Sequence, residues 1–131
     1  MSDKPLVSKL RKAGKVKSSE EALFGYKKIT LSNGVNVYFK STDLNKDEVL
    51  VRAFSRGGTS LYSDSEAITL SSVSGLMEIG GLGDFSYTEL TKALAGKKVG
   101  TEPYVNITEE GINGYSTPKD IETLFQLYYL Y

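Results

Sequence analysis

The chain has 131 residues and a mass of 14.3 kDa, which is the size of a single domain. Hydrophobic residues make up 40% and charged residues 24%, so the composition is that of a globular rather than a disordered chain. Sixteen basic residues balance sixteen acidic ones and the chain has neither Cys nor His, which excludes electrostatic attraction of nucleic acid or membranes, disulfides, thiolate or imidazole metal sites, and Ser-His-Asp catalysis.

Residues 1–24 are interpreted as a linker or N-terminal arm. Six basic residues precede Ser18, with only Asp3 opposing them: Lys4, Lys9, Arg11, Lys12, Lys15 and Lys17. The apolar residues of this segment show no sustained period. A basic tail for an anionic partner stays open as an alternative, but tails that bind nucleic acid usually carry a denser charge, so the linker is favoured.

Three strands are predicted in residues 26–55. The first two, Lys27–Leu31 and 35–40, alternate between apolar and polar residues and flank Asn33-Gly34. Asn-Gly between two alternating segments is a strong hairpin signal because both residues tolerate positive φ. The third strand, 48–55, has a near-continuous apolar centre, which predicts that both of its faces are covered.

Two helices follow, and each opens with a capping-box sequence. Ser63 and Glu66 begin a helix that is expected to end at Gly80-Gly81, and Ser86 and Glu89 begin a second helix. In this motif the hydroxyl and the carboxylate each accept a hydrogen bond from an N–H group that the helix leaves unpaired. Apolar residues of the first helix recur at helical spacing: Ala67, Leu70, Val73 and Met77.

Two further strands, 97–104 and 107–115, and a last helix complete the predicted elements. Pro103 cannot donate to a ladder, so the first of these strands belongs at a sheet edge or a bulge. Thr117 is the expected N-cap of the last helix, followed by Pro118. The order β-β-β-α-α-β-β-α predicts an α+β fold in which helices pack on one face of a mainly antiparallel sheet.

The C-terminal residues 124–131 are apolar or aromatic at every position except Gln126. A helix that is apolar on all sides is expected to be buried on all sides, yet this one stops without a C-cap. We therefore expect that the sequence is part of a longer protein, or that a second chain covers the helix. Exposure of this helix in an isolated chain favours self-association through residues 121–131.

No residue is assigned a catalytic, cofactor-binding or metal-binding role from the sequence. Most of the acidic residues that could form an acid/base pair fall in predicted turns and helix starts, where acids are favoured for other reasons: Asp43, Asp47, Glu48, Asp64, Glu66, Glu102, Glu109 and Glu110. Residues 80–83 (GGLG) follow a helix, whereas a dinucleotide-binding loop follows a strand, so they are interpreted as a helix end. The nine tyrosines lack accompanying basic residues and are assigned to core and interface packing.

Four segments of the sequence resemble the M16 metallopeptidases, the pitrilysin–insulinase clan. They are the hairpin 30–38, the strand and glycine-rich turn 54–62, the helix-to-helix connection 81–90, and the helix start 117–127. Each motif is weak alone, but their order and spacing together are fairly specific. The resemblance spans residues 25–131, about four fifths of the chain, and implies a partial domain of the LuxS/MPP-like fold.

An active M16 domain carries His-x-x-Glu-His on its first long helix, where the two histidines bind zinc and the glutamate is the general base. The resemblance places these three positions near Ser72, Gly75 and Leu76. Glu78 is the only acid in the latter half of that helix and has no imidazole beside it, and the family's further glutamate ligand would fall beyond Tyr131. The resemblance is therefore to a non-catalytic M16 domain.

The resemblance implies that residues 25–131 are the N-terminal portion of an inactive domain, truncated at its C-terminus, with residues 1–24 as a linker. Paired M16 domains enclose a chamber. The implied role is a structural domain of a zinc metalloendopeptidase, which closes the substrate chamber and packs on a catalytic domain in the same or a partner chain. Zinc would belong to that catalytic domain and peptide substrate to the chamber. Localisation is left open, although similar bacterial proteins are often periplasmic.

The alternative interpretation belongs to a different class of protein. It is a free-standing interaction module that dimerises through its apolar C-terminal helix, residues 121–131. Both interpretations explain the apolar helix, and they differ in what covers it.

Pro103 marks a departure from the family pattern. In active M16 domains the strand after the second helix pairs with substrate backbone through its edge. Proline removes one N–H donor from such an edge. We therefore expect that this strand does not bind peptide in the catalytic manner.

Overall fold

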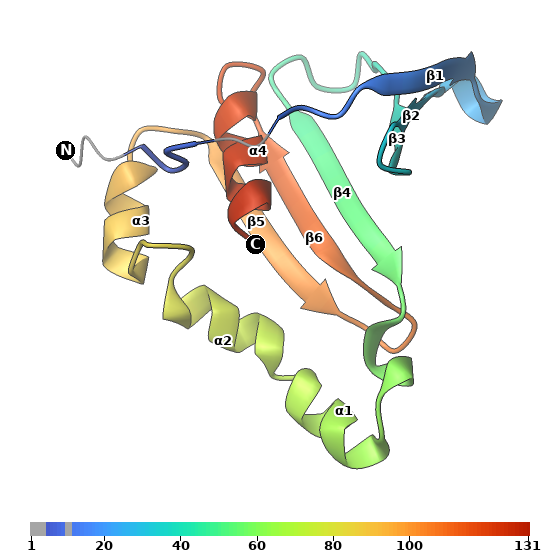
Figure 1. The fold of residues 1–131 in the computed structure, drawn as a ribbon. Helices are drawn as coiled ribbons and strands as arrows, with labels where there is room; N and C mark the ends of the chain where they lie inside the picture. Colours follow the sequence, from blue (N-terminus) through green and yellow to red (C-terminus); the bar gives the residue numbers. More distant parts are fainter. Residues whose placement is uncertain (1–4, 10–11) are drawn as a thin grey trace. The chain divides into compact units, whose positions relative to one another are not determined.

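A computed structural model describes residues 5–9 and 12–131, except for the side chain of Glu78. The chain divides into two compact units, Ser8–Lys46 and the segment 47–131 with residues 5–7. Its helices and antiparallel strands confirm the predicted α+β class. The elements, labelled in Figure 1, are β1 Val16–Glu21, β2 Lys27–Leu31, β3 Asn36–Phe39, β4 Val49–Arg56, α1 Asp64–Leu70, α2 Val73–Gly80, α3 Tyr87–Ala93, β5 Val99–Val105, β6 Glu109–Ser116 and α4 Ile121–Leu130.

The smaller unit, Ser8–Lys46, is a three-stranded antiparallel sheet in the order β1-β2-β3. The turn between β2 and β3 contains Asn33-Gly34, and Gly34 has a φ of 89°. A positive φ at this position is what glycine tolerates and most residues do not. The predicted hairpin is therefore confirmed.

Strand β1 lies inside the predicted arm 1–24, where the sequence shows no strand pattern. All six of its residues are exposed, so backbone pairing with β2, with Glu21 opposite Lys27, holds the strand in place. Lys4 and Arg11 of the arm lie outside the described residues. The predicted boundary at residue 24 stays a prediction.

The larger unit contains a second antiparallel sheet in the order β4-β6-β5, with β6 in the centre. Strand β6 pairs along its length with both neighbours, and Ser116 lies opposite Val49 of β4 and Val99 of β5. The strands are thus divided between two three-stranded antiparallel sheets. Pro103 lies in β5, an edge strand of its sheet, as predicted.

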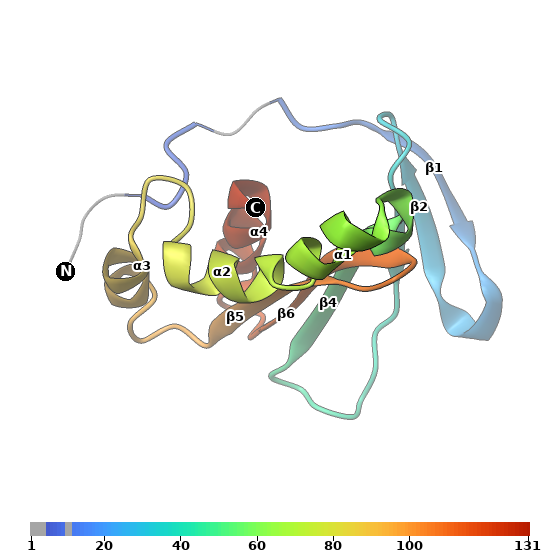
Figure 2. The ribbon, with the colours of Figure 1, turned by 90° about the horizontal axis from the view of Figure 1, so that it is seen from below.

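Helix α4 packs on one face of the β4-β6-β5 sheet and forms the core with it. Figure 2 shows α4 to one side of β5 and β6, which it contacts. Leu124 and Leu127 are 0% and 1% exposed and form a buried cluster with Leu82 and Val99. A Cβ atom at Gly114 of β6 would lie 2.8 Å from the Leu124 side chain, so glycine permits this close approach. Burial of a leucine side chain stabilises the fold by about 1.5–3 kcal/mol.

Tyr128 attaches α4 to the backbone of the sheet. Its hydroxyl lies 2.9 Å from the Val51 carbonyl oxygen of β4 and 3.0 Å from the Ile112 carbonyl oxygen of β6, and the two oxygens share its single hydrogen. Burial raises the pKa of the Tyr128 phenol to about 12, because a phenolate would lose hydration and could not donate to these carbonyls. The neutral phenol is therefore part of the helix-to-sheet contact.

The predicted helix 63–80 is interrupted, so the expectation of one continuous helix is wrong. Ser71 and Ser72 separate α1 from α2. The Ser71 hydroxyl donates to the Ile68 carbonyl oxygen at 2.7 Å, which is the way in which serine competes with helical hydrogen bonds. Gly75, close behind, adds the backbone entropy cost of a glycine inside a helix.

The helix starts agree only in part with prediction. The capping boxes at Ser63 and Ser86 are both present. The last helix begins at Ile121 with Asp120 as its N-cap, so the prediction of Thr117 as N-cap is wrong. Thr117 and Asp120 instead close a turn in which the Asp120 N–H donates to the Thr117 carbonyl oxygen at 3.0 Å.

The prediction that the third strand, now β4, is covered on both faces is also wrong. Leu50 and Phe54 are 72% and 62% exposed, because side chains alternate along a strand and these two lie on the face opposite α4. Helix α4 is not buried on all sides either, since Phe125 and Tyr129 are 53% and 45% exposed. Helix α4 therefore has one buried and one exposed side, whereas in β4 only Val49 and Val51 are half-buried and the other residues are exposed.

We predict that Tyr128→Phe lowers the free energy of unfolding by about 1 kcal/mol, the usual net contribution of one hydrogen bond. Tyr129→Phe, on the exposed side of the same helix, should change it by less than about 0.5 kcal/mol. Urea unfolding followed by circular dichroism measures both values.

The wild type and Tyr128→Phe should also differ in how their stability changes at high pH. The raised pKa of Tyr128 stabilises the fold below pH 10, the ordinary phenol value, and this contribution is lost as the pH rises towards 12. Between these values the wild type should therefore lose more stability than Tyr128→Phe. Equal losses in the two proteins would contradict the proposed role of the phenol.

Candidate functional site

The helix positions that the family resemblance aligns with a zinc motif do not fit a zinc ion. Ser72 lies at the break before α2, and Gly75 and Leu76 lie on α2. Zinc in proteins is held by histidine, cysteine and carboxylate side chains, and neither glycine nor leucine offers a donor atom. The side chain of Glu78 lies outside the described residues. The described side chains at these positions therefore provide no ligand set for a catalytic zinc ion.

The carboxylates of the sequence serve structural roles where the structure shows their partners. Among the described side chains, which do not include that of Glu78, no group of three or more acidic residues is arranged to hold a metal ion. Glu109 and Glu110 are adjacent in β6 and therefore point to opposite faces of the sheet. Glu66 accepts hydrogen bonds from the Ser63 N–H and hydroxyl at the start of α1. These three carboxylates do not converge on a common point at which a reaction could take place.

Glu110 fixes the glycine turn that follows β4. Its carboxylate accepts hydrogen bonds from the Ser55 hydroxyl and the Gly58 N–H, and the first of these contributes most to holding the pKa of Glu110 below its ordinary value of 4.5. Gly58 has a φ of 59°, and a Cβ there would lie 2.2 Å from the Asn106 carbonyl oxygen. The turn thus depends on glycine for space and on Glu110 for hydrogen bonding.

The face of the β4-β6-β5 sheet opposite α4 carries an arginine surrounded by aromatic rings. Arg52 forms an ion pair with Glu109 and donates from Nε to the Tyr104 hydroxyl at 3.1 Å. Its guanidinium carbon lies 5.5 Å from the ring centroids of both Phe54 and Tyr104, within the range of cation–π attraction. Hydrogen bonding to Tyr104, and then the charge of Glu109, raise the pKa of Arg52. We call the residues of this face the open face: Leu50, Arg52, Phe54, Tyr104, Glu109 and Tyr115.

The chemistry of the open face is that of a contact surface. Leu50, Phe54 and Tyr115 are each more than half exposed, so the face offers apolar and aromatic area around one cation whose charge is already balanced by Glu109. None of its six residues is the serine, threonine, cysteine or lysine that covalent catalysis commonly uses as a nucleophile. The arrangement can therefore pack against another surface or contact a peptide.

The β5 edge bears on the expectation about peptide binding. The Asn106 N–H donates to the Glu109 carbonyl oxygen and the Thr117 N–H to the Lys98 carbonyl oxygen, which fixes the hydrogen-bonded pairs at both ends of the β5–β6 ladder. Because such pairs alternate in an antiparallel ladder, the backbone groups of Val99, Thr101, Pro103 and Val105 point outward. Pro103 therefore removes an outward donor, as the expectation requires; whether peptide binds there stays a prediction.

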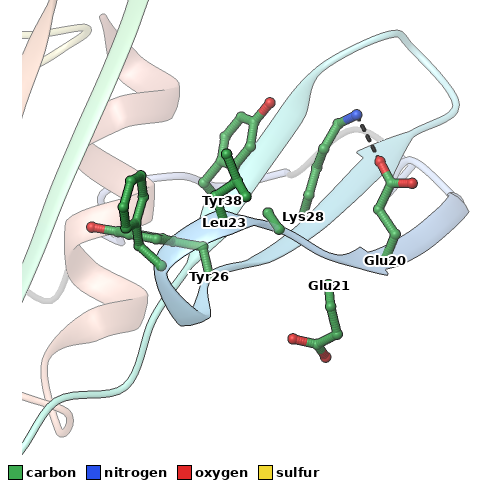
Figure 3. Close-up of a pocket in the computed structure, with 8 residues that line it drawn as sticks. Glu20, Glu21, Leu23, Tyr26, Lys28 and Tyr38 are labelled. Atoms are coloured by element: carbon green, nitrogen blue, oxygen red, sulfur yellow. Dashed lines mark hydrogen bonds and ion pairs between the residues drawn. The ribbon is translucent and has the colours of Figure 1, made fainter.

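The smaller unit has a shallow, open depression of about 710 Å³. Figure 3 shows an ion pair between Lys28 and Glu20 at one end and the side chains of Leu23, Tyr26 and Tyr38 at the other. The hydrogen bond to Glu20 raises the pKa of Lys28 above 10.5, whereas a catalytic lysine needs a lowered one. Lys28 is therefore held as a paired cation and is not poised to act as a base.

Local sequence patterns did not predict the open face. Its residues come from three strands, and an Arg beside Phe in β4 gives no recognisable spacing. The signal that was present is strand alternation, because Leu50, Arg52 and Phe54 occur at every second position. Reading that alternation instead of the continuous apolar run would have placed these side chains on one face.

Comparison with known proteins places the chain beside bacterial and plant proteases. No protein-family model matches it. It is 43% identical over 63 residues, or 48% of the chain, to a zinc protease PQQL-like protein from Arabidopsis thaliana. It superposes on the crystal structure of the periplasmic protease PqqL from Escherichia coli with a TM-score of 0.84, 19% identity and 98% of the chain covered. A mutant of the ferredoxin protease FusC, solved in complex with Arabidopsis ferredoxin, gives a TM-score of 0.77, 19% identity and 96% coverage.

These findings confirm the resemblance to M16 zinc proteases that the sequence motifs predict, and the chain has the fold of an M16 zinc protease-like domain. The chain spans 6% of the length of the curated relative and 14% of each solved chain. In the part of the chain that the structure describes, every helix is too short or too polar to cross a bilayer.

We predict that Glu110→Gln lowers stability at neutral pH and makes it less sensitive to acid. A depressed carboxyl pKa stabilises the fold above the ordinary value of 4.5, and the contribution is lost as the pH falls through the lower, folded-state value. Urea unfolding at pH 7 and at about pH 3 measures the difference for wild type, Glu110→Gln and the exposed control Glu102→Gln. A pH dependence that is unchanged in Glu110→Gln would exclude this role.

Proposed function

We propose that this chain is a non-catalytic structural domain of an M16-type zinc metalloendopeptidase, which closes the substrate chamber and packs on a catalytic domain. The observation that carries the proposal is the combination of an M16-like fold with Ser72, Gly75 and Leu76 at the positions of the zinc motif. The chain has the fold of an M16 protease domain, but two of these three residues, Gly75 and Leu76, have no side-chain atom that can bind a metal.

The open face supports a role as chamber wall. Its exposed aromatic and aliphatic side chains can contact unfolded peptide of varied sequence, because apolar contact is not directional. Arg52 adds a fixed cation that is held by Glu109 and Tyr104, so it can meet a peptide carbonyl or carboxylate without first being ordered. The neighbour FusC, a ferredoxin protease captured with ferredoxin, is consistent with a polypeptide as the substrate class.

Cofactor, partner and localisation follow from the same proposal. Zinc belongs to the catalytic domain, in the same chain or in a partner chain, and this domain holds none. Peptide substrate lies in the chamber between the two. The parent protein is assigned to the periplasm, because PqqL of Escherichia coli is a periplasmic protease.

The second candidate function, an interaction module that dimerises through α4, rests on the 53% and 45% exposure of Phe125 and Tyr129. Leu124 and Leu127 of the same helix are buried against the chain's own sheet. The helix thus has only part of its apolar surface left for a partner, so the first proposal is favoured.

The test is a zinc analysis and a peptidase assay on the purified chain. We expect far less than one zinc per chain and no turnover of an unfolded peptide, because the motif positions lack imidazole ligands. Ser72→Ala removes the one polar side chain among these positions and should leave the zinc content unchanged. Stoichiometric zinc, or turnover that a chelator abolishes, would refute the non-catalytic assignment.

A further inference from the structure

The sequence contains two Asn-Gly pairs, Asn33-Gly34 and Asn113-Gly114, and the structure holds them in opposite surroundings. Asparagine is one of the chemically labile residues of proteins. It is most reactive before glycine, because the missing side chain lets the next backbone nitrogen approach the asparagine side chain. The two pairs therefore share one local chemistry and differ in the fold around them.

Asn33-Gly34 lies in the turn between β2 and β3, and a Cβ at Gly34 would meet no atom within 4 Å. Two hydrogen bonds hold the pair. The Gly34 N–H donates to the Leu31 carbonyl oxygen at 3.0 Å, and the Val35 N–H donates to Asn33 Oδ1 at 3.2 Å. Hydrogen bonds of an exposed turn open at little cost in free energy. All the atoms that would react belong to this turn, so their geometry is set within the smaller unit.

Asn113-Gly114 lies in β6, the central strand of the larger unit, which pairs along its length with both β4 and β5. A Cβ at Gly114 would lie 2.8 Å from the side chains of Leu124 and Tyr128, so this glycine packs directly against α4. The Gly114 nitrogen can approach the Asn113 side chain only if the sheet and the core open. Opening of a central core strand is the most costly opening in a domain.

We propose that Asn33 is a site of spontaneous modification, at which the folded chain converts asparagine to aspartate and isoaspartate, whereas the fold protects Asn113. The Gly34 nitrogen loses its proton to hydroxide and attacks Cγ of Asn33. The bond from Cγ to Nδ2 breaks, and Nδ2 takes a proton from water and leaves as ammonia. Water then opens the resulting succinimide at the side-chain carbonyl, which gives aspartate, or at the main-chain carbonyl, which gives isoaspartate. The proposal is independent of the zinc protease assignment.

Isoaspartate at position 33 weakens the attachment of β1. It routes the main chain through the side-chain carbon and so lengthens the turn by a methylene group. The next residue back, Ser32, holds the chain just before β1: its N–H donates to the Lys15 carbonyl oxygen at 2.8 Å, and its Oγ accepts from the Lys15 N–H at 3.1 Å. Strand β1 has no buried residue, so it depends on such contacts. Aspartate keeps the normal backbone and leaves them in place.

The first test follows the purified chain in mildly alkaline buffer by mass spectrometry of its tryptic peptides. Cleavage after lysine separates the two pairs, because peptide 29–40 contains Asn33 and peptide 99–119 contains Asn113. In the folded chain we expect Asn33 to convert more than about tenfold faster than Asn113, because a turn opens far more often than a central strand. The control is the same chain in concentrated urea, where both pairs should convert at similar rates.

The second test measures brief trypsin cleavage after Lys15 and Lys17 in chains that have been kept in the same buffer. Cleavage of the wild type should rise with its isoaspartate content, which an isoaspartyl methyltransferase measures. Asn33→Gln blocks the reaction at this position, and Asn33→Asp supplies the new charge with a normal backbone, so cleavage of both variants should stay at its starting rate. Circular dichroism checks that each variant is folded.

Equal conversion of Asn33 and Asn113 in the folded chain would overturn the proposal, and so would conversion of Asn33 only after urea has unfolded it. A large difference that persists in urea would also contradict it, because neighbouring residues rather than the fold would then set the two rates. Unchanged cleavage in a chain that has accumulated isoaspartate would refute the weakened attachment of β1.

Discussion

The contact between α4 and the β4-β6-β5 sheet is the interaction on which the rest of the larger unit depends. Leu124 and Leu127 lose nearly all solvent contact there, and Gly114 lets the helix approach β6. Tyr128 adds hydrogen bonds to the backbone of two strands. Because this helix covers one face only, the opposite face keeps its apolar and aromatic side chains in solvent. The uncovered face is thus a consequence of the same packing that forms the core.

The core and the positions that the family resemblance aligns with a zinc motif lie in different parts of the larger unit. The buried residues lie on α4, β5, β6 and the connection between α2 and α3, whereas the positions that the resemblance aligns with a zinc motif lie at the α1–α2 break and on α2. Ser72, Gly75 and Leu76 are all exposed, so their replacement leaves the core unchanged. In the non-catalytic domain that we propose, these positions can therefore vary at little cost in stability, and Leu50, Phe54 and Tyr115 of the open face are exposed.

The sequence predicted the structure correctly where a short motif of a few neighbouring residues determines it. The Asn33-Gly34 hairpin and the Ser63 and Ser86 capping boxes need only a few neighbouring residues. Sequence reasoning failed where tertiary contacts decide. Strand β1 exists through pairing with β2, and the helix break at Ser71 reflects competition for a carbonyl. The candidate site could not be predicted for the same reason, because the partners of Arg52 come from β5 and β6, which the sequence cannot bring together by spacing alone.

The central claim is that one face of the β4-β6-β5 sheet forms the core and the other is left for a larger assembly. The most direct measurement is nuclear magnetic resonance of the side chains in the presence of a soluble paramagnetic gadolinium chelate. The account predicts strong relaxation of Leu50, Phe54 and Tyr115 and almost none of Leu124 and Leu127. Equal protection of both groups would show that the face is covered, and would contradict the account.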